Sequence, residues 1–364
     1  MNMKVFRRFA AGVVFVQLIA VFSSASAFGL RPESEIDGKI KALAPRPPIS
    51  RFWDEAAYVA INHFSHPVHE RITNLIWDCK SEEECNQTAP GKSFAPGAVI
   101  AGVRWNDNPP FELTTTSMKE CAGRTLWLPN YSNCWIKLFK DGEKRARSGE
   151  TLDLASGTII MLRSHFGDLQ FLHAMAAGRH ERAEETQSKI LMWAEFTWKV
   201  ANKEFTQGTL LSETNIPRLT NYFKSTETVQ TLFTRGNPTH RDDIGILALG
   251  ALLHTVEDSF SRSHVDRDEE NGQDCGPGMP KRPGMIRQFL NYALQDSSAH
   301  AVEDEEDAFD LQLATVRPNA VDVGKSLKAY FDRGAAWNEV KPYIECIFAV
   351  IDKDQETSAG NFGK

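Results

Sequence analysis

The sequence predicts an all-α protein with long loops held in place by disulfides. Several segments carry apolar residues at helical spacing, period-two strand patterns are scarce, and Pro- and Gly-containing loops separate the helical segments. Composition is ordinary for a globular protein, and no repeat or low-complexity tract divides the chain. We therefore expect residues 28–364 to form one helical domain.

The first 27 residues have the order of a secretory signal peptide. Three positive charges precede an apolar stretch at 9–22, and small residues follow it. Cleavage is expected after Ala27, so residues 1–27 are the signal peptide and the mature chain is soluble and secreted or periplasmic. An uncleaved anchor is the alternative, although the apolar stretch is shorter than the roughly 20 residues of a membrane span.

The charge balance argues against general attraction to anionic partners. The chain carries a net charge of −7, and loss of the three positive charges of the signal peptide would make it −10. Such a protein has no overall attraction for nucleic-acid backbones or anionic lipid surfaces. It could still bind a phosphate group locally, through metal ions.

The six cysteines are expected to form disulfides, because an even number in an exported chain favours bridges over thiolate metal sites. Six cysteines allow 15 connectivities. Short separations suggest the local bridges Cys79–Cys85 and Cys121–Cys134, which would leave Cys275 with Cys346. Any metal must then be held by histidines and carboxylates.

The elements follow from the spacing of apolar residues. The helical candidates are 54–78, 179–205, 243–264, 288–314 and 323–351. Residues 79–147 are predicted to be rich in loops, and residues 164–178 are predicted to form a short helix or a turn. Gly245 and Gly250 suit close packing of the helix at 243–264 against its neighbours.

The stretch "LHTVEDSFSRSH" carries the first chemical signal. His254 and Asp258 are four residues apart, about 40° around a helix axis and roughly 6 Å along it, and can share one metal ion. Taken alone, such a pair could instead be two polar side chains on the exposed face of a surface helix. The preceding residues "ILALGALL" are apolar, however, and a buried histidine and aspartate need partners. His264 would lie on another face of a continuing helix, so either the helix unwinds or His264 serves a second ion.

Other segments offer further ligands. "SSAHAVED" places His300 four residues before Asp304, and single candidates are His69, Asp107 and His165. Mixed imidazole and carboxylate ligation suits Zn²⁺. The sequence thus predicts a site for two or three zinc ions in a helical bundle.

The order His69, Asp107, "SHF" at 164–166, "LHTVEDSFSRSH" and "HAVED" resembles the zinc-dependent bacterial phospholipases C. Their all-helical trinuclear-zinc fold is shared with fungal single-strand-specific nucleases. The family motif His-x-x-x-Asp-x-x-x-x-x-His is matched in full by His254, Asp258 and His264.

The resemblance implies a role for each residue. One zinc would be held by Asp107, His165, His254 and Asp258, with Asp107 also the candidate general base. A second would be held by His264, His300 and Asp304.

The third zinc would be held by His69, a bridging Asp258 and the mature N-terminus. The family uses an N-terminal tryptophan there, whereas cleavage here would expose Phe28. Glu303 is the alternative to Asp304, because the family carries glutamate at the end of the last pair.

The remaining histidines are less favoured as ligands. His63 and His66 cannot share one helix face with His69, and His173 and His180 read as core or surface residues rather than ligands. Trp193 and Trp198 are expected in the core of the long helix at 179–205.

The preferred function is a secreted zinc-dependent phospholipase C, acting as a monomer at a membrane surface on the glycerol–phosphate ester of phosphatidylcholine-like lipids. Metal-activated water would attack the phosphorus. The alternatives are a zinc nuclease of the same fold, which would bind single-stranded nucleic acid through stacking aromatics, and a non-catalytic exported zinc-binding protein.

Overall fold

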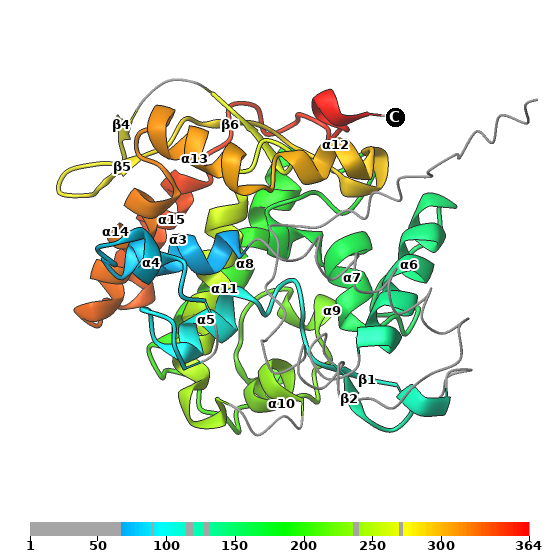
Figure 1. Ribbon diagram of the computed structural model, residues 1–364. Coiled ribbons are helices and arrows are strands. Elements are labelled where there is room, and N and C mark those ends of the chain that lie inside the picture. Colours follow the sequence, from blue (N-terminus) through cyan, green and yellow to red (C-terminus); the bar gives the residue numbers. More distant parts are fainter. Residues whose placement is uncertain are drawn as a thin grey trace, which may run out of the picture.

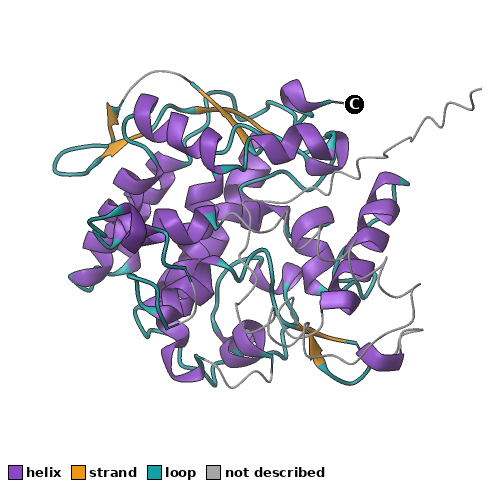
Figure 2. Ribbon diagram, viewed as in Figure 1, coloured by secondary structure: helices purple, strands orange, loops and turns teal. Residues whose placement is uncertain are grey.

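The computed structural model describes residues 67–88, 91–113, 119–126, 132–235, 240–268 and 272–363. The described part is largely helical, with only short strands (Figures 1 and 2). The helices are α3 (Val68–Ile76), α4 (Glu82–Cys85), α5 (Gly97–Val103), α6 (Ser132–Arg147), α7 (Ile160–Phe166), α8 (Ala183–Ala201), α9 (Leu219–Tyr222), α10 (Val229–Thr234), α11 (Ile244–Asp258), α12 (Ser297–Val302), α13 (Glu306–Thr315), α14 (Ala320–Asp332) and α15 (Trp337–Ile347).

Short 3₁₀ helices and three strand pairs complete these elements. The 3₁₀ helices are η1 (Lys119–Cys121), η2 (Gln170–His173), η3 (Leu211–Glu213), η4 (Arg241–Asp243), η5 (Tyr292–Leu294) and η6 (Gly360–Phe362). The antiparallel pairs join β1 (Phe111–Glu112) to β2 (Thr125–Leu126), β3 (Val265–Arg267) to β6 (Ile286–Phe289), and β4 (Gln273–Asp274) to β5 (Lys281–Arg282). In none of the described ranges is a helix both long and apolar enough to span a bilayer.

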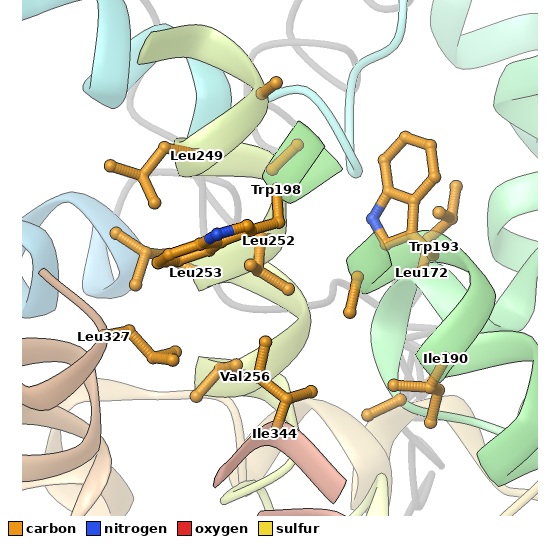
Figure 3. Packing of buried hydrophobic residues seen from close by; sticks show 14 of the residues in the cluster. Leu172, Ile190, Trp193, Trp198, Leu249, Leu252, Leu253, Val256, Leu327 and Ile344 are labelled. Atoms are coloured by element: carbon orange, nitrogen blue, oxygen red, sulfur yellow. The ribbon is translucent and has the colours of Figure 1, made fainter. Parts of the chain in front are cut away.

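Helix α11 runs through the centre of the main core and packs against α5, α8 and α14. Figure 3 shows Leu249, Leu252, Leu253 and Val256 of α11 in this core, with Trp198 of α8 beside Leu252 and Leu253. Trp193 and Trp198 are both fully buried, as the sequence predicts. Because α11 is apolar around most of its circumference, its polar residues at the C-terminal end are carried into the interior.

The crossing of α5 and α11 depends on two glycines. A Cβ on Gly250 would lie 2.3 Å from Val99 O and 2.7 Å from Gly102 Cα, and one on Gly102 would lie 2.2 Å from Leu247 O. The backbones therefore approach more closely than any side chain would allow. The close packing predicted for Gly250 is confirmed, and it brings the end of α5 against the polar end of α11.

A second core lies between α6, α7 and the Cys121–Cys134 bridge. It contains Trp135, Phe139 and Phe166. The three predicted disulfides are all present: Cys79–Cys85, Cys121–Cys134 and Cys275–Cys346.

Three segments differ from the prediction. Residues 79–147 are less rich in loops than expected, because α4 and α5 lie within them and α6 occupies the last 16, with Trp135 and Phe139 buried. Segment 323–351 holds two helices, since α14 ends at Asp332 and α15 begins at Trp337. Segment 288–314 is not one helix. Phe289 pairs with Val265 in a strand, and α12 and α13 follow as separate helices.

Candidate metal centre

His254 and Asp258 lie one turn apart at the end of α11, and both are fully buried. His254 Nε2 is 2.9 Å from Asp258 Oδ2, so the two groups face a common point, as their spacing predicts. On the other side of the ring, His254 Nδ1 donates to Val103 O at 2.5 Å. The glycine crossing makes this contact possible, since Gly102 precedes Val103 and Gly250 precedes His254 by one turn.

His69, on α3, reaches the same point from another direction. Its Nε2 is 3.3 Å from Asp258 Oδ1, and its ring stacks on that of His254 with centroids 3.9 Å apart. Its Nδ1 is hydrogen-bonded to Glu257 Oε2 at 2.6 Å. A carboxylate behind an imidazole is the usual outer partner of a histidine that binds a metal.

Asp107 enters from the loop after α5. Its Oδ1 is 3.9 Å from His165 Nε2 and 3.8 Å from His173 Nδ1, and its Oδ2 is 3.9 Å from His254 Nδ1. Both oxygens are buried, and neither has a hydrogen-bond partner among the described residues. Buried carboxylate oxygens without donors are costly, so their lone pairs are available to a cation.

The neighbouring Asn106 fixes this loop. Its Nδ2 donates to Leu172 O at 2.8 Å, and it also contacts Thr255 Oγ1 at 3.1 Å on α11. Asp107 and the segment that carries His173 are thereby held against one face of α11.

The helix ends at Asp258, and this resolves the position of His264. The next five residues form a turn, so His264 is not swung away as a continuing helix would require. Its Nδ1 is 3.6 Å from Asp258 Oδ1, and its Nε2 is 3.5 Å from Asp304 Oδ1. His264 therefore lies between two groups of residues. One is at the end of α11 and contains His173, His254 and Asp258 (the α11 group), and the other surrounds Asp304.

His300, on α12, completes this second group. Its Nε2 is 3.0 Å from Asp304 Oδ2, and its ring stacks on that of His264 with centroids 5.0 Å apart. Asp304 Oδ1 accepts hydrogen bonds from Ser261 Oγ at 2.7 Å and Ser263 Oγ at 3.1 Å. Asp304 is buried whereas Glu303 is partly exposed, which favours Asp304 as the acid of this pair.

Five of the buried histidines share one orientation: Nδ1 is tied to an acceptor outside the cluster and Nε2 faces inward. The acceptors are Glu257 for His69, Met161 O for His165, Val103 O for His254, His173 O for His264 and Gln295 Oε1 for His300. Such outer bonds fix the tautomer and leave the Nε2 lone pair for a metal ion.

The interior sets the protonation of these rings. Burial lowers the pKa of His69 and His165 to about 3 and that of His173 to about 4, so each ring is neutral near pH 7. His264 differs. Burial alone would lower its pKa, but the charges of Asp258 and Asp304 raise it to about 9.

The pKa values of Asp107 and Asp258 are shifted in opposite directions. Burial raises the pKa of Asp107 well above its usual value. Burial also acts to raise the pKa of Asp258, but attraction to His254 and His264 holds it well below the usual range. Among the described residues, the ion pairs of these two aspartates are all with histidines. A divalent cation could take over the role of these histidines as the positive partner of the two carboxylates.

The structure brings together all eight predicted ligands that fall within the described residues. They are His69, Asp107, His165, His254, Asp258, His264, His300 and Asp304. The groups that could hold an ion are His69–Asp107–His254, Asp107–His165–His173, His173–His254–Asp258 and His264–His300–Asp304. The grouping differs from the expected one, because His173 belongs to two of them. Phe28, His63 and His66 lie outside the described residues.

Sequence reasoning missed two members of the cluster. His173 is buried among the other rings, whereas His180 is exposed and pairs with Glu356. Glu257, beside Asp258, is the outer partner of His69. The signal for Glu257 was present, since it is an acidic residue inside an otherwise apolar helix.

A small cavity opens beside the cluster. Four histidines, His165, His173, His264 and His300, line one part of it, and its other walls are Phe139, Ser164, Gln170, Met175 and Tyr292. The cavity thus combines possible metal ligands with a partly apolar wall.

Comparisons of this chain with models of known protein families, with curated proteins and with solved structures found no match. The chemistry of the site therefore rests on its own residues.

Proposed function

We propose that the protein is an exported, zinc-dependent phosphodiester hydrolase, and that within this class it acts as a phospholipase C on phosphatidylcholine-like lipids. The observation that carries the proposal is the convergence of buried histidines and aspartates with Nε2 atoms facing inward. Donors about 2.0–2.2 Å from a tetrahedral ion are about 3.3–3.6 Å apart. The ligand-to-ligand distances of 2.8–3.5 Å in the two tightest groups are slightly shorter than this, so small side-chain shifts would admit an ion.

Zinc is the ion that the donor set favours. Neutral imidazoles mixed with carboxylates suit Zn²⁺, whereas an oxygen-only set would suit Mg²⁺ or Ca²⁺. Thiolates do not compete, because all six cysteines are in disulfides.

Residues of the cluster and of the cavity wall would carry out proton transfer and substrate binding. Bound zinc supplies a Lewis acid that draws charge from phosphate oxygens and lowers the pKa of water. Burial alone would keep Asp107 protonated, but a bound cation would favour its carboxylate form, which could then take the proton from the attacking water. Neither of its oxygens has a hydrogen-bond partner among the described residues. The wall formed by Phe139, Met175 and Tyr292 would contact the apolar part of the substrate and exclude bulk water.

The same wall would also fit a nuclease, because Tyr292 and Phe139 could stack on a base. The net charge of −7 gives a nucleic acid no general attraction, and for this reason we favour the lipid substrate.

One assay separates the alternatives. The protein is dialysed against a chelator, divided, and assayed with and without added zinc on phosphatidylcholine vesicles and on single-stranded DNA. We expect release of phosphocholine that disappears on chelation and returns with zinc. Hydrolysis of DNA alone would identify a nuclease, and zinc binding without hydrolysis of either would identify a binding protein. His180→Ala is the matched control, since this histidine is exposed and outside the cluster.

Export is a separate part of the proposal. Three disulfides fit an oxidising compartment. Mass spectrometry of the protein from the producing cells should find Phe28 as the first residue, outside the cytoplasm. A chain beginning at residue 1 would contradict this. Light scattering would test the monomeric state that we expect.

A further inference from the structure

His173 makes the shortest contact between two possible metal ligands of the cluster. Its Nδ1 is 2.8 Å from Asp258 Oδ2 and 3.0 Å from His254 Nε2, and those two atoms are 2.9 Å apart. Three donor atoms in a triangle with such edges can be the ligands of a single divalent ion. The resemblance to the phospholipases C gives no role to this position.

The orientation of His173 is the reverse of that of its neighbours. The other five buried histidines turn Nε2 inward, but His173 turns Nδ1 toward Asp258 and Asp107. Its Nε2 is buried and has no hydrogen-bond partner among the described residues. The ring also lines the cavity, together with His165, His264 and His300.

The backbone holds this orientation in place. Leu172 O accepts hydrogen bonds from Asn106 Nδ2 and Thr255 Oγ1, each at 2.8 Å, and His173 O accepts one from His264 Nδ1 at 2.8 Å. The next residue, Ala174, has a φ of +52°, a left-handed conformation that residues other than glycine rarely adopt. A conformation of this kind persists only where surrounding contacts enforce it. His173 is therefore fixed between the two ligand groups.

We infer that His173 binds a metal ion through Nδ1, with His254 and Asp258, and uses Nε2–H to donate a hydrogen bond to the phosphate group of the substrate. This inference rests on the proposed function. A neutral imidazole carries one proton, so binding an ion through Nδ1 leaves the proton on Nε2. Since the ring lines the cavity and Nε2 has no hydrogen-bond partner among the described residues, a phosphodiester oxygen could accept that proton. His173 would thus link ion and substrate.

Two conservative substitutions separate the two roles. Asparagine places its amide near the position of Nδ1, and glutamine places its amide near that of Nε2. His173→Asn, His173→Gln, His173→Ala and the control His180→Asn are prepared in zinc, and the bound zinc is counted by plasma mass spectrometry. Zinc affinity is measured by competition with a chromogenic chelator, and thermal unfolding in excess zinc checks that each variant folds.

We expect His173→Ala and His173→Gln to lose one zinc equivalent or to bind it at least about 100-fold more weakly, more than the loss of an outer partner causes. His173→Asn should keep more of that zinc but show a lower kcat/KM on phosphatidylcholine vesicles. His180→Asn should match the wild type in both.

Wild-type zinc number and affinity in His173→Ala and His173→Gln would overturn the inference while leaving the proposed function intact. A wild-type protein that binds no zinc would overturn the proposed function as well. Equal kcat/KM in wild type and His173→Asn would remove the hydrogen-bond role of Nε2.

Discussion

The two His-x-x-x-Asp pairs have the same spacing but different support. His254 and Asp258 both lie within α11, a helix of 15 residues that is packed in the core. His300 lies on α12, which has six residues and ends before Asp304. Regular helix and glycine packing fix the first pair, whereas hydrogen bonds from Ser261 and Ser263 hold the acid of the second. The same sequence pattern can therefore depend on quite different contacts.

The largest expected effect follows from removing one of the two aspartates. Asp258 contacts His69, His173, His254 and His264, so Asp258→Asn should lose more than one zinc equivalent and all measurable hydrolysis. Asp304→Asn should lose one equivalent, because Asp304 belongs only to the group that it forms with His264 and His300 (the α12 group). Zinc analysis of both variants tests this. Equal losses would show that the two groups are not distinct.

The metal-free protein should lose stability on both sides of neutral pH. His69, His165 and His173 have folded pKa values of about 3–4, below the unfolded value near 6.5, so they stabilise the fold above pH 6.5 and this stability is lost as pH falls from there. His264 has a raised pKa of about 9, so its contribution is complete below pH 6.5 and is lost as pH rises through 9.

Urea unfolding of chelator-treated protein between pH 4 and 9 measures this dependence. On the acid side, the free energy of unfolding should fall more steeply than the about 1.4 kcal/mol per pH unit of a single proton. A free energy of unfolding that does not change with pH would contradict the buried, neutral state of His69, His165 and His173.

The glycine crossing offers a test of the support for the α11 pair. Gly250→Ala should lower the free energy of unfolding by about 1–3 kcal/mol, because the new Cβ meets Val99 O and Gly102 Cα. Gly245→Ala, on the same helix, is the milder comparison and should cost less, since its Cβ would lie 3.2 Å from the carbonyl oxygens of Val200 and Ala201. Urea denaturation compares them. Equal stabilities would show that α5 moves aside without cost.

The smallest expected effect concerns the support for the α12 pair. Replacing both Ser261 and Ser263 by alanine removes the hydrogen bonds to Asp304 and should weaken zinc binding there about tenfold. The α11 group should be unaffected. Chelator competition measures both affinities, with the exposed Ser148→Ala as control. A change at the α11 group instead would contradict the separate support of the two pairs.

The sequence predicted the helical class and the disulfides, because helical spacing and cysteine separation are local signals. Local spacing also indicated the pairs His254–Asp258 and His300–Asp304 as candidate ligands, whereas His69, Asp107 and His165 were expected from the resemblance to the phospholipases C. It did not predict α6, whose apolar residues are concentrated in its first half, or the strand at Phe289, which depends on a partner distant in the chain.

His173 was missed for the same reason. No ligand partner stands four residues from it, and its neighbours Asp107, His254 and Asp258 come together only through tertiary packing. The outer partner Gln295 likewise depends on the turn before α12, which no periodic pattern indicates.

Anomalous diffraction from crystals grown with zinc, measured at the zinc absorption edge, tests the central claim most directly. We predict one peak among His173 Nδ1, His254 Nε2 and Asp258 Oδ2, and another among the Nε2 atoms of His264 and His300 and the carboxylate of Asp304. A well-ordered, zinc-replete crystal with no anomalous density at either position would contradict a metal centre in this protein.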